Sequence, residues 1–347
     1  MAKPTESSSK LIQLPQARSA QPPKPGGDHD ARFIHPDVVY HCILRTVRGT
    51  YLLRPDRAGQ VEQIIGGVMK RAKELYPDVE VFSDAWLSNH AHLLVRGPPK
   101  QIPFFIGFLK REVSRRLSKV LGWSDGIFRR GYNPTALLSP QSQRNAQTYV
   151  LSQGVKENLV QRPQQWPGTH SAKELSTGKP RYGIWFDGTG YARAKHKYHA
   201  RVQRGKPPNP RDFEHKTEFL FDRLPALQDL SDKEHQAYIN LELEKIVQTA
   251  ADTRRATGKK ILGRRAVYAT SPFARSELPE QPPHEKRRRM IIWDDRRCPE
   301  ARAYLEQYRR FQDAYRRASK LFRDGNLNAV FPPGAFRPPS FAVALAA

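Results

Sequence analysis

The sequence predicts an α+β fold, with a ferredoxin-like (split βαβ) antiparallel sheet, helices on one face, and a mainly helical or irregular basic extension. Short segments in which apolar and polar residues alternate indicate strands, and longer segments with apolar residues every three or four positions indicate amphipathic helices. These segments follow one another as β-α-β-β-α-β, which is the order of the split βαβ arrangement.

The first half of this order starts with a strand. Residues 38–46 alternate apolar and polar side chains, and residues 57–75 then carry apolar residues at helical spacing until Pro77 ends the helix. Residues 79–87 and 90–96 are two further strands. The short turn between them predicts a hairpin.

The second half starts with an amphipathic helix at residues 102–121, whose outer face is basic. Residues 127–138 indicate an extended segment that Pro134 interrupts. Ser139 and Pro140 then open another helix, because Ser caps helices well and Pro is tolerated in the first turn.

Two histidines, His90 and His92, lie one residue apart in the strand at 90–96. Because side chains on a strand alternate between faces, both imidazoles point the same way. Two neutral imidazoles side by side are half of a site for a divalent metal ion. The plainer interpretation is a pair of half-exposed residues on a polar face.

Tyr149 and Gln153 lie four residues apart in the last predicted helix and share one face of it. A phenol and a carboxamide opposite a two-histidine strand suggest a tyrosine nucleophile that acts on a phosphate with the help of a metal ion. Alone, such a tyrosine is more often a core residue, and the combination favours catalysis. His35 and His41 are further candidates, for which packing or DNA contact is the simpler interpretation.

Three segments resemble the REP-associated tyrosine transposases and the IS200-like single-tyrosine transposases. SNHAHLLVRG resembles their histidine-hydrophobic-histidine (HUH) strand, TYVLSQGVKENLVQRPQQWPGTHSA their tyrosine helix, and VYHCILRTVRG their first strand. The pieces occur in the family order and span residues 33–172.

The chain also departs from the family pattern. Gln153 and Gly154 stand where many REP-associated members carry Asn and Pro, whereas a Gln at this spacing is the third metal ligand of the insertion-sequence enzymes. Thr148 replaces the usual Arg before the tyrosine, and Lys156 and Glu157 replace Arg and Ala. These differences bear on which subgroup the chain resembles and which DNA element it recognises. They do not affect the catalytic set, whose residue types are all present.

The resemblance implies an HUH-endonuclease fold and a transposase that cleaves and rejoins single-stranded DNA through a 5′-phosphotyrosine on Tyr149. It implies Mg²⁺ or Mn²⁺ held by His90, His92 and Gln153. Two alternatives stay open: a domesticated or inactive protein that binds hairpin DNA, and an RNA-binding protein on the same fold. The expected partner is single-stranded or hairpin DNA, with no membrane and with a homodimer left open.

Composition agrees with a nucleic-acid partner. The 347 residues include 59 Lys and Arg against 34 Asp and Glu, a net charge of +25, which indicates a polyanionic partner such as nucleic acid or an acidic membrane surface. No apolar run is long enough to span a membrane, which excludes an integral membrane protein. Two distant cysteines indicate no disulfide framework, so we expect a bacterial cytoplasmic protein associated with the nucleoid.

We expect three parts along the chain: a disordered tail at 1–32, the catalytic domain at 33–175, and a basic extension of unknown fold at 176–347 that adds affinity for DNA. Basic and aromatic residues alternate at 176–212, which suits either a single-strand binder or a loosely packed linker.

The extension contains two predicted helices and a basic run. Residues 231–255 start with a capping box of Ser231 and Glu234, and residues 299–323 form a strongly charged helix with an aromatic stripe. Residues 286–289 are four consecutive cations.

Basic side chains of the catalytic domain are expected to contact the nucleic acid. They lie on the basic outer face of the helix at 102–121 and on the extended segment after it. The expected contacts are Lys110, Arg111, Arg115, Arg116, Arg129 and Arg130.

Overall fold

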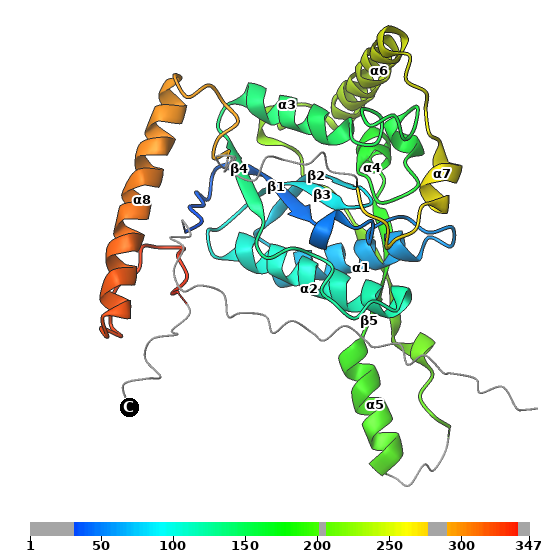
Figure 1. Ribbon diagram of the computed structural model, residues 1–347, viewed down its shortest axis with the longest axis horizontal. Helices are drawn as coiled ribbons and strands as arrows, with labels where there is room; N and C mark the ends of the chain where they lie inside the picture. The colour runs from blue at the N-terminus through cyan, green and yellow to red at the C-terminus, as the bar shows by residue number, and fades with distance from the viewer. Residues whose placement is uncertain (1–30, 201–205, 277–289, 339–347) are drawn as a thin grey trace, which may run out of the picture.

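The computed structural model describes residues 31–200, 206–276 and 290–338. Figure 1 shows a central sheet between helices, with one helix at the left edge and another projecting below the body. Most of the predicted disordered tail and the basic run at 286–289 lie outside the described residues.

The centre of the fold is a four-stranded antiparallel sheet with the strand order β2-β3-β1-β4. Its strands are β1 (Val39–Arg45), β2 (Glu80–Trp86), β3 (His90–Arg96) and β4 (Asn133–Leu137). Pro134 remains inside β4, which tolerates it because β4 lies at the edge of the sheet. The predicted α+β class with an antiparallel sheet is confirmed.

Helices cover both faces of this sheet (Figure 1). α1 (Gln60–Leu75) and α2 (Gln101–Leu121) pack on one face, where Leu93 of β3 joins their core. α3 (Pro140–Leu151) covers the other face, where Leu94 joins a second core. The prediction of helices on one face is therefore wrong for α3. The physical reason is that alternate residues of β3 are apolar on both sides, so both faces need cover.

A second, two-stranded sheet packs on α1. Its strands are β5 (Arg181–Phe186) and β6 (Glu214–Phe219), which pair antiparallel. The backbones approach closely at glycines: a Cβ on Gly67 would lie 2.1 Å from the carbonyl oxygen of Ile184. Only glycine permits this contact. Within the segment at 176–212, Arg181–Phe186 is therefore an ordered strand, which the linker interpretation missed.

The remaining helices lie at the periphery of the fold, around the central sheet and the helices that cover it (Figure 1). They are α4 (Ala172–Thr177), α5 (Gly188–Ala200), α6 (Asp232–Thr257), α7 (Arg264–Ala269) and α8 (Pro299–Arg323), with short 3₁₀ turns at Val47–Gly49, Pro163–Gln165, Pro210–Phe213 and Pro225–Leu227. The predicted Ser231 capping box and the predicted helix at 299–323 are both confirmed. Within the described ranges, none of the helices is both long and apolar enough to cross a membrane.

Residues beyond 175 also contribute to the core of the first sheet. Phe219, Ile292 and Tyr304 belong to the same buried cluster as β1 and β3. Ile291 and Trp293 form backbone hydrogen bonds with Ala136 of β4, of 2.8 and 2.9 Å. The domain boundary at 175 stays a prediction. These contacts join residues after 175 to the sheet formed by residues before it.

Candidate active site

Three histidines lie together on the face of the sheet that α3 covers. His90 and His92 come from β3, and His41 comes from the neighbouring strand β1. Nε2 of His41 and Nδ1 of His92 share a hydrogen bond of 2.8 Å, and the two rings stack with their centroids 5.0 Å apart. Nδ1 of His90 lies 2.6 Å from Oδ1 of Asn89. The predicted pair on one face thus has a third imidazole beside it.

These contacts leave one ring nitrogen of His90 and one of His92 available to bind a metal ion. The Oδ1 atom of Asn89 only accepts hydrogen bonds, so Nδ1 of His90 donates and its Nε2 carries a lone pair. Nε2 of His92 is buried and has no hydrogen-bond partner among the described residues. When Nδ1 of His92 donates to His41, this Nε2 is also a free ligand nitrogen.

Burial keeps the imidazoles neutral. Desolvation is the main reason that the pKa of His41 and that of His90 fall to about 4; the positive charge of Lys156, joined at His90 by that of Arg45, contributes to the same shift. The pKa of His92 also lies well below its usual value, first because of burial and then because of the neighbouring His41. Neutral imidazole is the form that binds metal ions.

Tyr149 of α3 lies against this cluster. Its ring centroid is 5.6 Å from that of His92 and 5.8 Å from that of His41. Nζ of Lys156 lies 3.9 Å from the ring centroid, and the ring of Trp293 is at 5.6 Å. The phenol is therefore held between the histidine strands, a cation and an indole, and it keeps partial solvent exposure.

Gln153 lies close to Tyr149 but not on its helix. α3 ends at Leu151, and Gly154 has a φ of 82°, which a helix does not contain. Nε2 of Gln153 donates to the carbonyl oxygen of Tyr149 at 2.9 Å. Gln153 is fully buried, and its Oε1 has no hydrogen-bond partner among the described residues. The prediction that the two residues share a helix face is corrected, since a turn places Gln153.

The donor set suits a divalent cation. Imidazole nitrogens and an amide oxygen are neutral donors that divalent metal ions accept, and two of these atoms are buried without a partner among the described residues. No group of three His, Cys, Asp or Glu side chains forms a metal site within the described ranges. The expected set contains only two residues of these types, and its third member, Gln153, is an amide.

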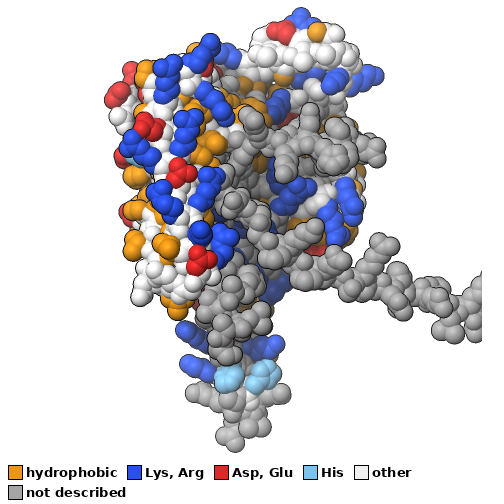
Figure 2. Space-filling view, turned by 60° about the vertical axis from the view of Figure 1, so that its left-hand side comes forward, with side chains coloured by type: hydrophobic (Ala, Val, Ile, Leu, Met, Phe, Trp, Pro, Cys, Tyr) orange, Lys and Arg blue, Asp and Glu red, His pale blue; other side chains and the backbone are white. Residues whose placement is uncertain are grey.

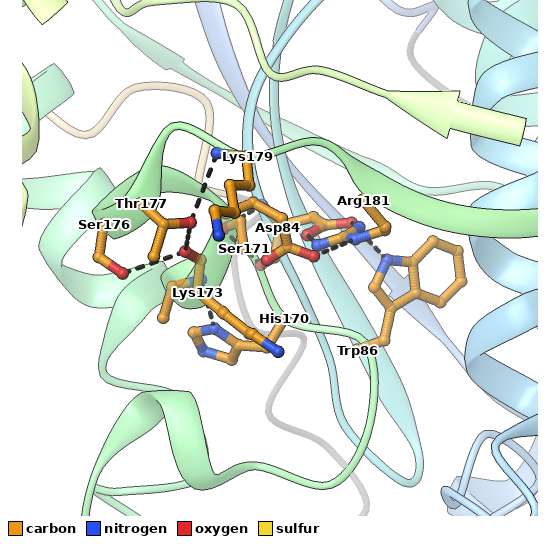
Figure 3. A network of polar contacts seen from close by, with 11 residues as sticks. Asp84, Trp86, His170, Ser171, Lys173, Ser176, Thr177, Lys179 and Arg181 are labelled. Atoms are coloured by element: carbon orange, nitrogen blue, oxygen red, sulfur yellow. Dashed lines mark hydrogen bonds and ion pairs between the residues drawn. The ribbon is translucent and has the colours of Figure 1, made fainter.

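A buried ionic network supports the edge of the sheet beside the site (Figure 3). Arg181 of β5 donates to both carboxylate oxygens of Asp84 on β2, at 2.6 and 2.8 Å, and to Glu174 at 2.9 Å. Nε1 of Trp86 donates to the same Asp84 at 2.8 Å. Ser171 donates to and accepts from the Asp84 backbone. The network joins β2, α4 and β5.

His170 lies next to Ser171 of this network (Figure 3). It pairs with Ala85 at the edge of β2, and its Nδ1 accepts from the backbone N–H of Ala172 at 3.1 Å. Burial lowers the pKa of His170 to about 4, while the Asp84 carboxylate and, less strongly, the carbonyl groups of Gln153 and Val150 act in the opposite direction. A neutral His170 therefore lies beside the backbone that carries Gln153, and the spacing of the sequence contained no signal for it.

The residues expected to contact nucleic acid lie mostly on α2, on the opposite face of the sheet from Tyr149 (Figure 1). Arg111, Arg115, Arg129 and Arg130 are exposed. Arg116 is buried, donates to the carbonyl oxygen of Phe186, and lies over the ring of Trp185. The structure thus places Arg116 in the packing between α2 and β5.

Comparisons with known proteins give weak matches. A REP-associated tyrosine transposase bound to a REP hairpin matches with a TM-score of 0.32 and 15% identity, over 42% of this chain and 83% of the other. A candidate transposase from Deinococcus radiodurans matches with a TM-score of 0.24 and 18% identity, over 32% and 87%. No family model and no curated protein matches.

Proposed function

We propose that this protein is an HUH-type transposase that cleaves and rejoins single-stranded DNA with Tyr149 as the nucleophile. The strand order β2-β3-β1-β4, with α1 and α2 on one face, supports a ferredoxin-like fold of this type. The observation that carries the proposal is the packing of the Tyr149 ring against His92, with the buried Gln153 bound to the Tyr149 backbone.

In this mechanism the phenol oxygen of Tyr149 attacks the scissile phosphate. An oxygen–phosphorus bond forms to the tyrosine and the bond to the 3′ oxygen breaks, so that the phenol loses its proton and the leaving oxygen gains one. The products are a 5′-phosphotyrosine and a free 3′-hydroxyl group, and reversal of the step joins a new strand. Lys156, beside the phenol, supplies a positive charge for the phosphate.

His90, His92 and Gln153 would hold the Mg²⁺ or Mn²⁺ ion. When bound, the ion supplies Lewis-acid polarisation of the phosphate. His41 and Asn89 act as positioning residues, because their hydrogen bonds orient the two imidazoles.

The main alternative is a protein that binds hairpin DNA or RNA without cleaving it. A site that no longer works has no need to keep its nucleophile, both imidazoles and the amide in one place, which favours the enzyme. The net charge suits either nucleic acid.

The first experiment tests the nucleophile. The protein is incubated with single-stranded hairpin DNA and Mg²⁺, and a covalent adduct is sought on a denaturing gel. Tyr149→Phe should abolish the adduct and leave DNA binding nearly unchanged, since Phe keeps the ring and loses the oxygen. Tyr132→Phe is the matched control and should behave like the unmodified protein. An adduct that persists in Tyr149→Phe and disappears in Tyr132→Phe would reassign the nucleophile.

The second experiment tests the metal ligands. His90→Ala and His92→Ala should remove cleavage and its response to Mg²⁺ or Mn²⁺, because each removes a ligand nitrogen. Gln153→Ala should have a milder effect, since water can replace an amide oxygen. Metal binding measured by calorimetry gives a readout besides cleavage. Undiminished cleavage in EDTA would contradict the proposal of a metal site.

A further inference from the structure

α5 has an unusual charge pattern for a helix. Its 13 residues, GTGYARAKHKYHA, contain three Lys or Arg and two His and no acidic residue. Arg193, Lys195 and Lys197 are all exposed. In Figure 2 the projection at the bottom of the molecule carries blue and pale blue side chains and no red ones.

The base of α5 is firmly attached to the body. The ring of Tyr191 packs against Phe186 at 5.7 Å and against Phe213 at 5.5 Å. Asp187 accepts a hydrogen bond from the backbone of Gly190 at 3.0 Å, and its own backbone N–H donates to Phe213 at 2.8 Å. The rest of the helix stands away from the body (Figure 1). The anchored base therefore fixes where the helix begins and the direction in which it projects.

The exposed cations surround much of the helix. At 3.6 residues per turn, the Lys, Arg and His side chains of α5 cover an arc of about 200°, and Tyr191, Ala194 and Tyr198 lie on the remaining arc. Arg193 and Lys197 are four residues apart, and like charges at this spacing destabilise a helix. Acidic side chains, which would offset the repulsion, are absent from α5. A helix of this length with little packing is only marginally stable in water.

We propose that α5 is a DNA-binding element that lies in the major groove of a DNA duplex and contacts the phosphates on both sides. A cationic arc this wide fits between two rows of phosphates better than against one strand. A helix with its side chains is about 10–12 Å across, and the major groove is about 12 Å wide. The duplex neutralises the charges that otherwise repel one another, so it also stabilises the helix.

This inference rests on the proposed function only in taking DNA as the polyanion. Tyr149 lies on the α3 face of the sheet, whereas α5 continues from β5 on the α1 side. Cleavage of an unpaired strand at Tyr149 and binding of a duplex at α5 can therefore succeed or fail separately. A hairpin substrate offers both structures in one molecule.

The test uses the full chain with Arg193→Gln, Lys195→Gln and Lys197→Gln combined. Binding to a duplex, and to one of its strands alone, is measured over a range of salt concentrations. Each phosphate contact on a duplex contributes about 0.9 to the slope of log K against log salt, so the slope should fall by up to about 2.7. Binding to the single strand should change little. Hydrogen exchange of the α5 amides should slow when duplex is added to the unmodified protein.

A matched control removes three charges from α8. It combines Arg302→Gln, Arg309→Gln and Arg317→Gln, three exposed positions on a helix that also carries acidic residues. An equal fall in slope for both triple variants would mean that net charge alone is responsible, which overturns the proposal. An unchanged slope, or an equal loss of affinity for the single strand, would overturn it as well. The melting temperature of the α5 variant should not fall, because the three side chains are exposed and their replacement removes like-charge repulsion within the helix.

Discussion

Replacing Arg181 by Met should destabilise the whole protein, because Arg181 is the buried cation of the network in Figure 3. Its side chain is only 5% exposed, and that of Asp84 is fully buried. Although burial by itself lowers the pKa of Arg181, the carboxylates of Asp84 and Glu174 raise it above its usual value. Met has a similar length and no charge, so the change removes the cation without leaving a large cavity.

The expected cost follows from what the substitution leaves behind. Two carboxylates lose their cation, and Asp84 keeps the hydrogen bond from Trp86. Removing one partner of a buried ion pair costs about 3–5 kcal/mol. In a domain of 150–250 residues each kcal/mol lowers the melting temperature by about 2–4 °C, so a decrease on the order of 10 °C is expected.

The assay is thermal and urea unfolding of the full chain, with a double variant as control. Arg181→Met combined with Asp84→Asn removes the uncompensated charge of Asp84, leaves that of Glu174, and keeps an acceptor for Trp86, so it should recover part of the loss. Because Asp84 lies in β2 and Arg181 in β5, the result also shows whether the chain on both sides of residue 175 unfolds together. A cost below about 1 kcal/mol for Arg181→Met alone would refute the reasoning.

Two further predictions concern Trp293 and the buried histidines. Trp293, whose partly exposed ring lies 5.6 Å from that of Tyr149, is expected to stack on a base of the bound strand. Trp293→Phe should therefore keep affinity for single-stranded DNA near that of the unmodified protein, whereas Trp293→Leu should lower the affinity and leave the salt slope unchanged, because base stacking on an aromatic ring contributes about 1–3 kcal/mol and involves no phosphate. Equal binding by the Leu variant would contradict this. Burial lowers the pKa of His41 and of His170 to about 4 from 6.5, so the unfolded chain takes up these protons first as the pH falls. As the pH falls from about 6.5 to about 4, the free energy of unfolding should therefore decrease by up to about 3 kcal/mol per histidine. A free energy of unfolding, measured with urea, that stays constant over this pH range would contradict the prediction.

Local patterns in the sequence determined the elements of the first sheet. The strand predicted at 90–96 is β3 itself, and the alternation of its side chains placed His90 and His92 on one face, where the structure has them. The helix predicted at 299–323 coincides with α8. These features depend on residues within a few positions of one another, and the periodicity of apolar residues records such short-range preferences directly.

Contacts between distant segments were decided only by the tertiary structure. The hydrogen bond between His41 and His92, and the approach of Trp293 to Tyr149, join residues that are far apart in the chain. The ion pair of Asp84 with Arg181 does the same. Each partner alone is an ordinary side chain in its own segment. Its role arises when the strands pair and the later chain packs on β4 and α1, because pairing and packing, rather than spacing, set which distant side chains meet.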